Sequence, residues 1–486
     1  MRTRISSWAA SKYFYPLASF VITLLAGLIR FLDLNSPSVL VFDETYYVKD
    51  AWTLGQNGTE RAWPDNPNPN FESGMVDTYL DQAQYVVHPP IGKWVIYLGM
   101  MLFGADNSFG WRFSVALLGT LAIPLIIACA RILTGSKVYA TSAGLLLAIE
   151  GQSIVLSRTA ILDGILAFFV LLAFYLLLRD QKSWLKKLRT AAALGQKLPL
   201  NYRPYLIAAG LVLGLATGTK WSGLYFVAFF GLFVAASEIG YRKALGASFG
   251  SGVLQSVFSF LSLVPISIGV YVIGWSGWIF GTNGWGRNPD KGWLIPLWDY
   301  HLNALGFHTG LSSEHNYEAG AFSWLINLRP TAFYFERYET ATAACPIPQN
   351  CTIAVTALAH PLIWLAGLVC IICAIWIWIR KKDHSAGLIA VAFLAGWLPW
   401  AFFPERTTFQ FYATVFAPYF VLAIVYVLHR SRRKAITRNR LEAAEKFQLR
   451  LLLISIAMFF FFASLWLGIP TTDWFWQIQM WLPSWV

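Results

Sequence analysis

LASFVITLLAGLIRFL, residues 17–32, is an apolar run followed directly by the polar stretch DLNSPSVLVFDETYY, residues 33–47. An apolar helix of about this length can cross the hydrocarbon core of a bilayer. No small-x-small cleavage site follows, so we expect an uncleaved first span and not a removed signal peptide. The adjacent carboxylates Asp43 and Glu44 then fall at a bilayer surface. There they could act as a base on a lipid-borne substrate, or simply solvate a loop.

Composition extends this interpretation to the whole chain. Of the 486 residues, 57% are hydrophobic and only 13% are charged. The mean hydropathy is +0.52. These values predict an all-α integral membrane protein with about 11 transmembrane helices. We expect spans at 17–32, 113–131, 138–149, 160–178, 204–219, 221–237, 255–278, 355–379, 386–403, 409–428 and 451–469.

Charge patterning predicts the orientation. With a cytoplasmic N-terminus, the inside segments contain 25 of the 37 Lys and Arg, Arg2 and Arg4 among them, but only 5 of the 25 Asp and Glu. Basic residues concentrate on the cytoplasmic side of membrane proteins, and this asymmetry accounts for the net charge of +12. The basic balance therefore needs no nucleic acid as a partner. We expect a multi-pass protein of the cell membrane.

Two polar regions on the extracytoplasmic side are long enough to form a site. We divide the chain into an N-terminal transmembrane core, 1–278, with a first outer loop at 33–112; a second outer loop, 279–354; and C-terminal helices, 355–486. The tail from Thr471 should lie on the outer surface, because Trp favours the headgroup zone. Short helices are expected in both loops.

The five cysteines fall into two groups. Cys345 and Cys351 lie in the second outer loop, where the redox environment permits a disulfide bond. Cys129, Cys370 and Cys373 lie in apolar spans. We interpret Cys370-x-x-Cys373 as membrane packing and not as a zinc motif, because no His is near.

Polar residues recur at the outer ends of the predicted spans. Four cations, Arg30, Arg112, Arg158 and Lys220, are expected near the outer headgroup plane. A buried cation is costly in a membrane unless it meets an anion. The phosphate of a lipid would supply that anion. The alternatives are snorkelling to the surface and internal ion pairs such as Arg158 with Asp163.

The motifs in combination resemble a known family. The motifs are Asp43-Glu44, His88-Pro89-Pro90-x-Gly92-Lys93, Trp111-Arg112-Phe113, Glu150-Gly151 with Ser157-Arg158-x-x-x-Leu162-Asp163, and Thr219-Lys220-Trp221-Ser222-Gly223. This set is similar to that of the protein O-mannosyltransferases of bacterial, actinobacterial type. The resemblance implies a GT-C glycosyltransferase fold and transfer of mannose from polyprenyl-phosphate mannose to Ser or Thr of proteins crossing the membrane. The second loop is too short for the β-trefoil module of eukaryotic relatives.

The resemblance also implies roles for individual residues. Asp43 would be the catalytic base, with Glu44 orienting the acceptor or the base. The donor phosphate would be bound by Arg112 and Lys220, with Arg30 and Arg158 as further candidates. The pocket for donor and acceptor would include His88, Trp221, Asp163 and His308. The stretch Ser313 to Ala319 departs from the family pattern, so the acceptor contacts are left open.

The expected reaction is a single displacement with inversion, which requires no cofactor or metal. Its partners would be the lipid-linked donor, unfolded secretory proteins and the secretion translocon. One alternative is a GT-C enzyme that moves another lipid-linked sugar, such as arabinose, onto a glycolipid. Another is a transporter of lipid-linked substrates, which should show internal repeats and ionisable groups at the bilayer midplane. A zinc site at His301, His308 and His315 is a further alternative, since their sevenfold spacing could align them on one helix face.

Overall fold

The computed structural model describes residues 11–437 and 439–486, so the predicted inside cations Arg2, Arg4 and Arg438 lie outside the described residues. Within those ranges, nine helical segments are long and apolar enough to cross a membrane. They are α2 (Phe14–Phe31), α6 (Ser108–Thr134), α9 (Leu162–Ala193), α11 (Gly223–Ala244), α12 (Phe249–Gly274), α16 (Pro361–Lys381), α17 with η2 (His384–Phe402), η3 with α18 (Gln410–Thr437) and α19 (Leu441–Leu467). The multi-pass, mostly helical fold is confirmed.

Two of the eleven expected spans are short helices. The expected spans at 138–149 and 204–219 are helices α7 (Lys137–Ala148) and α10 (Pro204–Thr219), of 12 and 16 residues. At 1.5 Å per residue, neither reaches across a 30 Å hydrocarbon core. Helix α7 is followed by the short helix α8 (Gly151–Leu156), which Glu150 caps by accepting hydrogen bonds from two backbone N–H groups.

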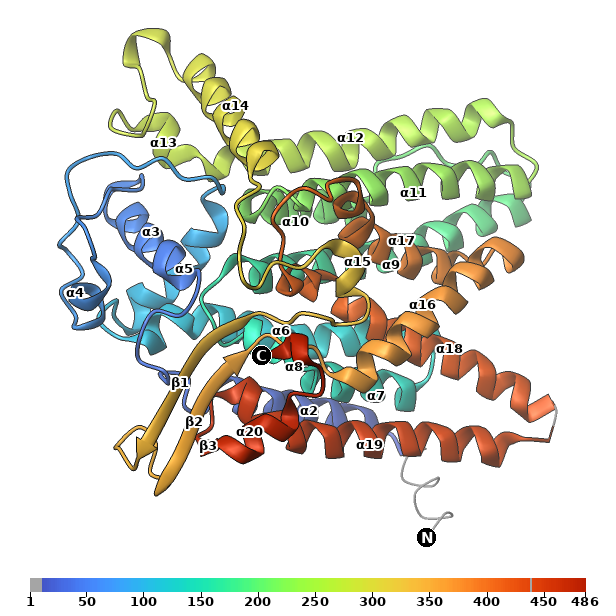
Figure 1. The fold of residues 1–486 in the computed structure, drawn as a ribbon. Coiled ribbons are helices and arrows are strands. Elements are labelled where there is room, and N and C mark those ends of the chain that lie inside the picture. Colours follow the sequence, from blue (N-terminus) through green and yellow to red (C-terminus); the bar gives the residue numbers. More distant parts are fainter. Residues whose placement is uncertain (1–10, 438) are drawn as a thin grey trace.

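The long connections gather at one end of the helices, on the left in Figure 1. The first contains α3 (Glu44–Asn57), α4 (Asn68–Glu72) and the apolar α5 (Ile91–Phe103). The second contains η1 (Pro289–Lys291), α14 (Leu294–Gly310) and α15 (Ala321–Trp324), after α13 (Ser276–Phe280). The tail after α19 adds α20 (Asp473–Gln479) and η4 (Pro483–Trp485). The short helices expected in both outer loops are therefore present.

A small sheet at this end was not expected from the sequence. Strands β1 (Ala332–Thr340) and β2 (Gln349–Thr356) form an antiparallel hairpin, and β3 (Thr471–Thr472) pairs with β2. The predicted bridge between Cys345 and Cys351 is present within this hairpin. The predicted span at 355–379 begins instead at Pro361, because residues 355 and 356 complete β2. The sheet is a small addition to a fold that is mostly helical, as predicted.

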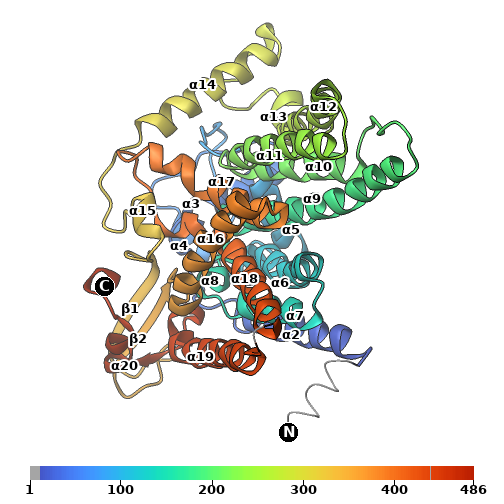
Figure 2. The ribbon, with the colours of Figure 1, turned by 90° about the vertical axis from the view of Figure 1, so that its right-hand side faces the viewer.

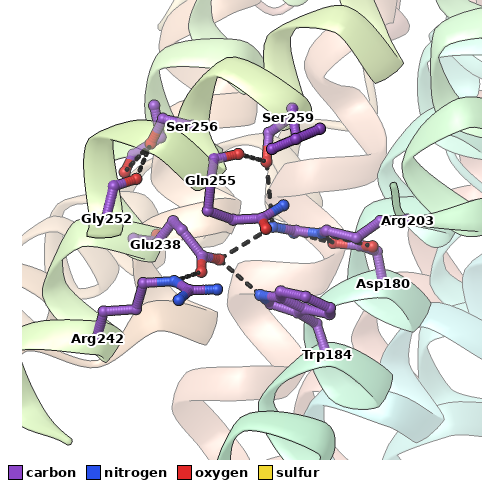
Figure 3. A network of polar contacts seen from close by, with 12 residues as sticks. Asp180, Trp184, Arg203, Glu238, Arg242, Gly252, Gln255, Ser256 and Ser259 are labelled. Carbon is purple, nitrogen blue, oxygen red and sulfur yellow. Dashed lines mark hydrogen bonds and ion pairs between the residues drawn. The ribbon is translucent and has the colours of Figure 1, made fainter. Parts of the chain in front are cut away.

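Buried ion pairs tie the helices together at the opposite end (Figure 3). Arg203, at the start of α10, pairs with Asp180 of α9 and with Glu238 of α11. Trp184 donates a 2.7 Å hydrogen bond to Glu238, which also pairs with Arg242. Two cations and two carboxylates thus cancel in a buried cluster that joins α9, α10 and α11. The end-on view of Figure 2 shows these helices with α12 as one group, separated from α2, α7 and α19.

Candidate active site

Asp43 is the residue immediately before α3. It is half-buried, and its carboxylate makes no hydrogen bond or ion pair with any residue in the described ranges. Burial raises the pKa of Asp43 to about 7; nearby Lys220 lowers it and Asp163 raises it. A carboxylate with a pKa near neutrality and no fixed partner can accept a proton from a bound substrate.

The backbone before Asp43 is strained. Phe42 has φ of +48°, a conformation that bulky side chains rarely adopt and that costs roughly 1–3 kcal/mol. Its ring stacks on Phe333 of β1 at 5.0 Å and meets Phe409 and Phe411 edge-on at 5.8 and 5.5 Å. These rings come from two distant segments and hold Phe42 in place. The strained residue therefore fixes the direction in which the chain presents Asp43.

Glu44, the second carboxylate of the motif, is engaged entirely within the protein. It is fully buried and accepts 2.8 Å hydrogen bonds from Nε and Nη2 of Arg112. It also accepts hydrogen bonds from the backbone N–H groups of Val41 and Ala160. Arg112 directs its remaining N–H groups to the carbonyls of residues 34, 37 and 39. All five donors of this guanidinium are used, which leaves none for a phosphate.

Arg158 and Arg30, the further phosphate candidates, are also engaged with protein groups. Arg158 does not pair with Asp163 but donates to the carbonyls of residues 29, 30, 32 and 33, at the end of α2. Arg30 is buried and donates to the carbonyls of Ala26 and Ala148. This geometry favours a structural role for Arg158, whereas Nε of Arg30 is buried without a hydrogen-bond partner among the described residues.

Lys220, in contrast to the three arginines, lies close enough to Asp43 to lower the pKa of its carboxyl group. Its ammonium donates to both carboxylate oxygens of Asp163, at 2.9 and 3.0 Å, and lies 3.9 Å from the ring centroid of Tyr412. Lys220 caps the end of α10, and Asp163 lies in the first turn of α9. Two chain segments 57 residues apart thus place one charge pair beside the candidate base.

A cavity that opens to solvent adjoins this pair, and Lys220 is part of its lining. Its lining includes the predicted pocket residues His88, Trp221 and His308 together with Lys220 and Arg406. Asp43 and Asp163 do not line it, but Asp163 pairs with Lys220, and Lys220 lowers the pKa of Asp43. The cavity therefore combines cations with aromatic walls, a composition suited to a phosphate joined to an apolar chain.

The polar groups of the cavity suit an anion. Arg406 pairs with no carboxylate among the residues that the structure describes; it donates to the carbonyl of His308 and lies over the ring of Trp400. Nδ1 of His88 is buried without a hydrogen-bond partner. Burial first, and then Lys220, hold the pKa of His88 well below its ordinary value, so the ring is neutral at pH 7 and can still donate one hydrogen bond.

Two functional candidates were missed from the sequence. Arg406 lies in the short outer connection between η2 and η3, where the predicted topology already placed a cation beside a span end. Tyr47 lies one helical turn after Asp43, and Asp43 and Asp163 both raise its pKa, after the larger effect of burial. The helical spacing of Asp43 and Tyr47 was the available signal.

The zinc alternative is not favoured. His301 and His308 lie on α14, but His315 lies beyond its end and packs 4.9 Å from the ring of Phe409. Across the described part of the chain, no group of three His, Cys, Asp or Glu side chains could hold a metal ion.

Comparisons with known proteins identify the family. Residues 72–274 match the family model described as dolichyl-phosphate-mannose-protein mannosyltransferase. Residues 294–485 match the C-terminal four-helix region of protein O-mannosyltransferases. The chain belongs to the protein O-mannosyltransferase family. It is therefore a membrane glycosyltransferase, as the sequence motifs indicated.

Individual members of the family align over nearly the whole chain. The polyprenol-phosphate-mannose–protein mannosyltransferase of Mycobacterium tuberculosis is 31% identical, over 96% of this chain and 91% of the relative. The protein of the same name from Corynebacterium glutamicum is 28% identical, over 96% and 92%. The predicted bacterial type agrees with these matches.

Solved structures confirm the GT-C fold. The Saccharomyces cerevisiae protein O-mannosyltransferase Pmt1-Pmt2 complex, bound to its sugar donor, superposes with a TM-score of 0.75 at 14% identity, over 97% of this chain and 92% of that chain. ArnT from Cupriavidus metallidurans, bound to undecaprenyl phosphate, superposes with a TM-score of 0.54 at 16% identity, over 94% and 77%. The likeness at these identities concerns the fold alone.

Proposed function

We propose that this mannosyltransferase transfers mannose from polyprenyl-phosphate mannose to Ser or Thr hydroxyls of unfolded secretory proteins, with Asp43 as the general base. The observation that carries the proposal is the unengaged carboxylate of Asp43, with its pKa of about 7, beside the pair of Lys220 and Asp163. The relatives from mycobacteria and corynebacteria carry names for the same donor and a protein acceptor.

The donor phosphate would occupy the cavity lined by Lys220, Arg406 and His88. Lys220 is already paired with Asp163, so the uncompensated charge comes from Arg406. The orphaned Nδ1 of His88 offers a further hydrogen bond. Trp221 and Leu305, on the same walls, would contact the sugar or the first prenyl units.

In the reaction, the acceptor oxygen forms a bond to the anomeric carbon while the bond from that carbon to the phosphate oxygen breaks. The hydroxyl proton passes to Asp43, and the bonding electrons leave on the phosphate. Proton removal by a positioned base is worth about 10²- to 10⁴-fold in rate. Arg406 and Lys220 stabilise the departing negative charge, so the scheme needs neither a general acid nor a metal ion. Attack from the opposite side inverts the anomeric centre.

The positive-inside pattern supports a site on the extracytoplasmic face, where a newly translocated chain is still unfolded. The secretion translocon would then be the source of acceptor. Equal modification of a folded and an unfolded form of one acceptor by the purified enzyme would contradict the need for that partner.

The test is transfer of radiolabelled mannose from polyprenyl-phosphate mannose to a Ser/Thr-rich peptide by the purified protein. We expect transfer by the wild type and none by Asp43→Asn. A glycolipid acceptor and polyprenyl-phosphate arabinose, offered in parallel, test the alternative transferase. Labelling of these, and not of the peptide with mannose, would overturn the proposal.

A further inference from the structure

One edge of the outer sheet has no partner. The strand order is β1-β2-β3, so β1 pairs with β2 on one side only. Outside the sheet, no backbone hydrogen bond joins residues 332–340 to any other described segment. An edge strand of this kind presents unpaired N–H and C=O groups that can pair with another extended chain.

This free edge begins at the active site. Phe333, the second residue of β1, stacks on Phe42 with an interplanar angle of 11°, and Phe42 is directly followed by Asp43. From there the strand runs outward to the hairpin tip (Figure 1). A chain paired with the edge at Phe333 would therefore lie close to Phe42, the residue directly before the candidate base Asp43.

The hairpin is held firmly from its other side. β3 pairs with β2, and Asp473 of α20 pairs with Arg337 at 2.7 Å and accepts a 3.0 Å hydrogen bond from Thr352. The Cys345–Cys351 bridge closes the loop between the strands. A strand fixed in this way is ordered before a partner arrives, which reduces the entropy lost on binding.

We propose that an extended stretch of the acceptor protein pairs with the free edge of β1 as an additional strand and so presents its Ser or Thr to Asp43. The inference rests on the proposed transfer to protein acceptors. Pairing through the backbone gives affinity that depends little on side chains, which suits an enzyme that modifies many sequences. A folded acceptor has no free strand to offer and would be excluded.

The edge also carries charges that limit unwanted pairing. Glu336, Arg337 and Glu339 are exposed on the outer half of β1. Charged side chains on an edge strand discourage association between copies of the same protein. If this were their whole purpose, the edge would bind no acceptor, and the experiments below distinguish the two cases.

The first experiment is an N-methyl scan of the acceptor peptide with the wild-type enzyme. N-methylation removes one backbone donor and leaves the side chain unchanged. We expect KM to rise about five- to tenfold at alternate positions on one side of the modified Ser, because only every second amide of a strand faces its partner. Equal effects at all positions, or none, would overturn the proposal.

The second experiment removes donors from the enzyme. Glu336→Pro and Arg337→Pro are neighbours on β1, so one loses an N–H that faces β2 and the other an N–H on the free edge. The variant whose melting temperature equals that of the alanine variant at the same position is the free-edge variant, and we expect its KM for the peptide to rise about five- to tenfold above that of the alanine variant. Glu336→Ala and Arg337→Ala are the matched controls for the lost side chains. An unchanged KM in the free-edge variant would overturn the proposal.

The outcomes separate this inference from the proposed function. If the wild type transfers no mannose to the unmodified peptide, the proposed function fails. If transfer occurs but neither N-methylation nor the proline substitution alters KM, the function stands and the edge-pairing inference fails.

Discussion

Arg112 and Glu44 form a buried, two-pronged ion pair in which both carboxylate oxygens lie 2.8 Å from the guanidinium. The pair connects α6 to the first turn of α3, directly after Asp43. The two acidic residues of one motif thus differ in their surroundings: Glu44 anchors the helix, and the carboxylate of Asp43 has no hydrogen-bond or ion-pair partner among the described residues.

Breaking this pair should destabilise the protein. Removing one partner of a buried ion pair leaves the other charge uncompensated and costs about 3–5 kcal/mol. We expect Arg112→Ala and Glu44→Ala each to lower the melting temperature, and the double variant to lose less than the sum of the two. Thermal unfolding in detergent checks this expectation. If Arg112→Ala kept wild-type stability but lost donor affinity, the arginine would belong to the phosphate site after all.

Asp43→Asn should abolish transfer yet leave donor binding unchanged. The amide keeps the shape of the side chain but cannot accept the acceptor's proton, so kcat should fall about 10²- to 10⁴-fold. Single-turnover transfer and binding of labelled donor lipid measure the two effects separately. The matched control is Asp65→Asn, an exposed residue of the same loop. Wild-type kcat in the Asp43 variant would require another base.

The pH dependence should report the same group. Asp43 acts as a base only when ionised, and its pKa is raised to about 7 by burial. The rate should therefore rise with pH through about 7 and then level off, whereas a carboxylate with an ordinary pKa would already be ionised at pH 5. A pH profile of kcat checks this. A flat profile between pH 5 and 8 would argue against Asp43.

Arg406→Ala should weaken donor binding. Arg406 lines the cavity and pairs with no carboxylate in the part of the chain that the structure describes. A charge-assisted hydrogen bond from such a cation is worth about 1.5–3 kcal/mol, or roughly 10- to 100-fold in donor affinity. Titration with polyprenyl phosphate measures the loss. Lys291→Ala, an exposed cation of the same outer region, should bind as the wild type does. Unchanged affinity in the Arg406 variant would place the phosphate elsewhere.

Arg203→Ala should destabilise the end of the molecule opposite the candidate active site and leave the transfer reaction unchanged. The change leaves Asp180 and Glu238 facing each other in a buried cluster without their shared cation (Figure 3). We expect a loss of about 3–5 kcal/mol of stability and a normal KM in the protein that stays folded. Lys197→Ala, exposed in the neighbouring loop, is the control. A melting temperature equal to that of the wild type would show that the cluster is not needed.

The sequence was most informative where one physical effect dominates. Long apolar runs predicted the helices because membrane burial determines them, and the spacing of Cys345 and Cys351 predicted their bridge. The partners of the cations could not be predicted: Arg112 and Lys220 both meet an internal carboxylate, but only the fold shows that Lys220 also lines a cavity.

The hairpin was missed for a different reason. Residues 332–340, AFYFERYET, are rich in aromatic residues but do not alternate cleanly between apolar and polar, because β1 is an edge strand with a bulge near Tyr334. The pairing of β2 with β3 depends on a segment more than a hundred residues away, and local periodicity carries no information on such contacts.

The position of β3 in the chain has a consequence for biogenesis. Four helices, α16 to α19, are synthesised between β2 and β3. The hairpin can fold and oxidise as soon as it emerges, but its third strand arrives only after these helices have entered the bilayer. The outer sheet is therefore completed late. A chain stalled before α19 would contain Asp43 but would lack β3, the third strand of the sheet.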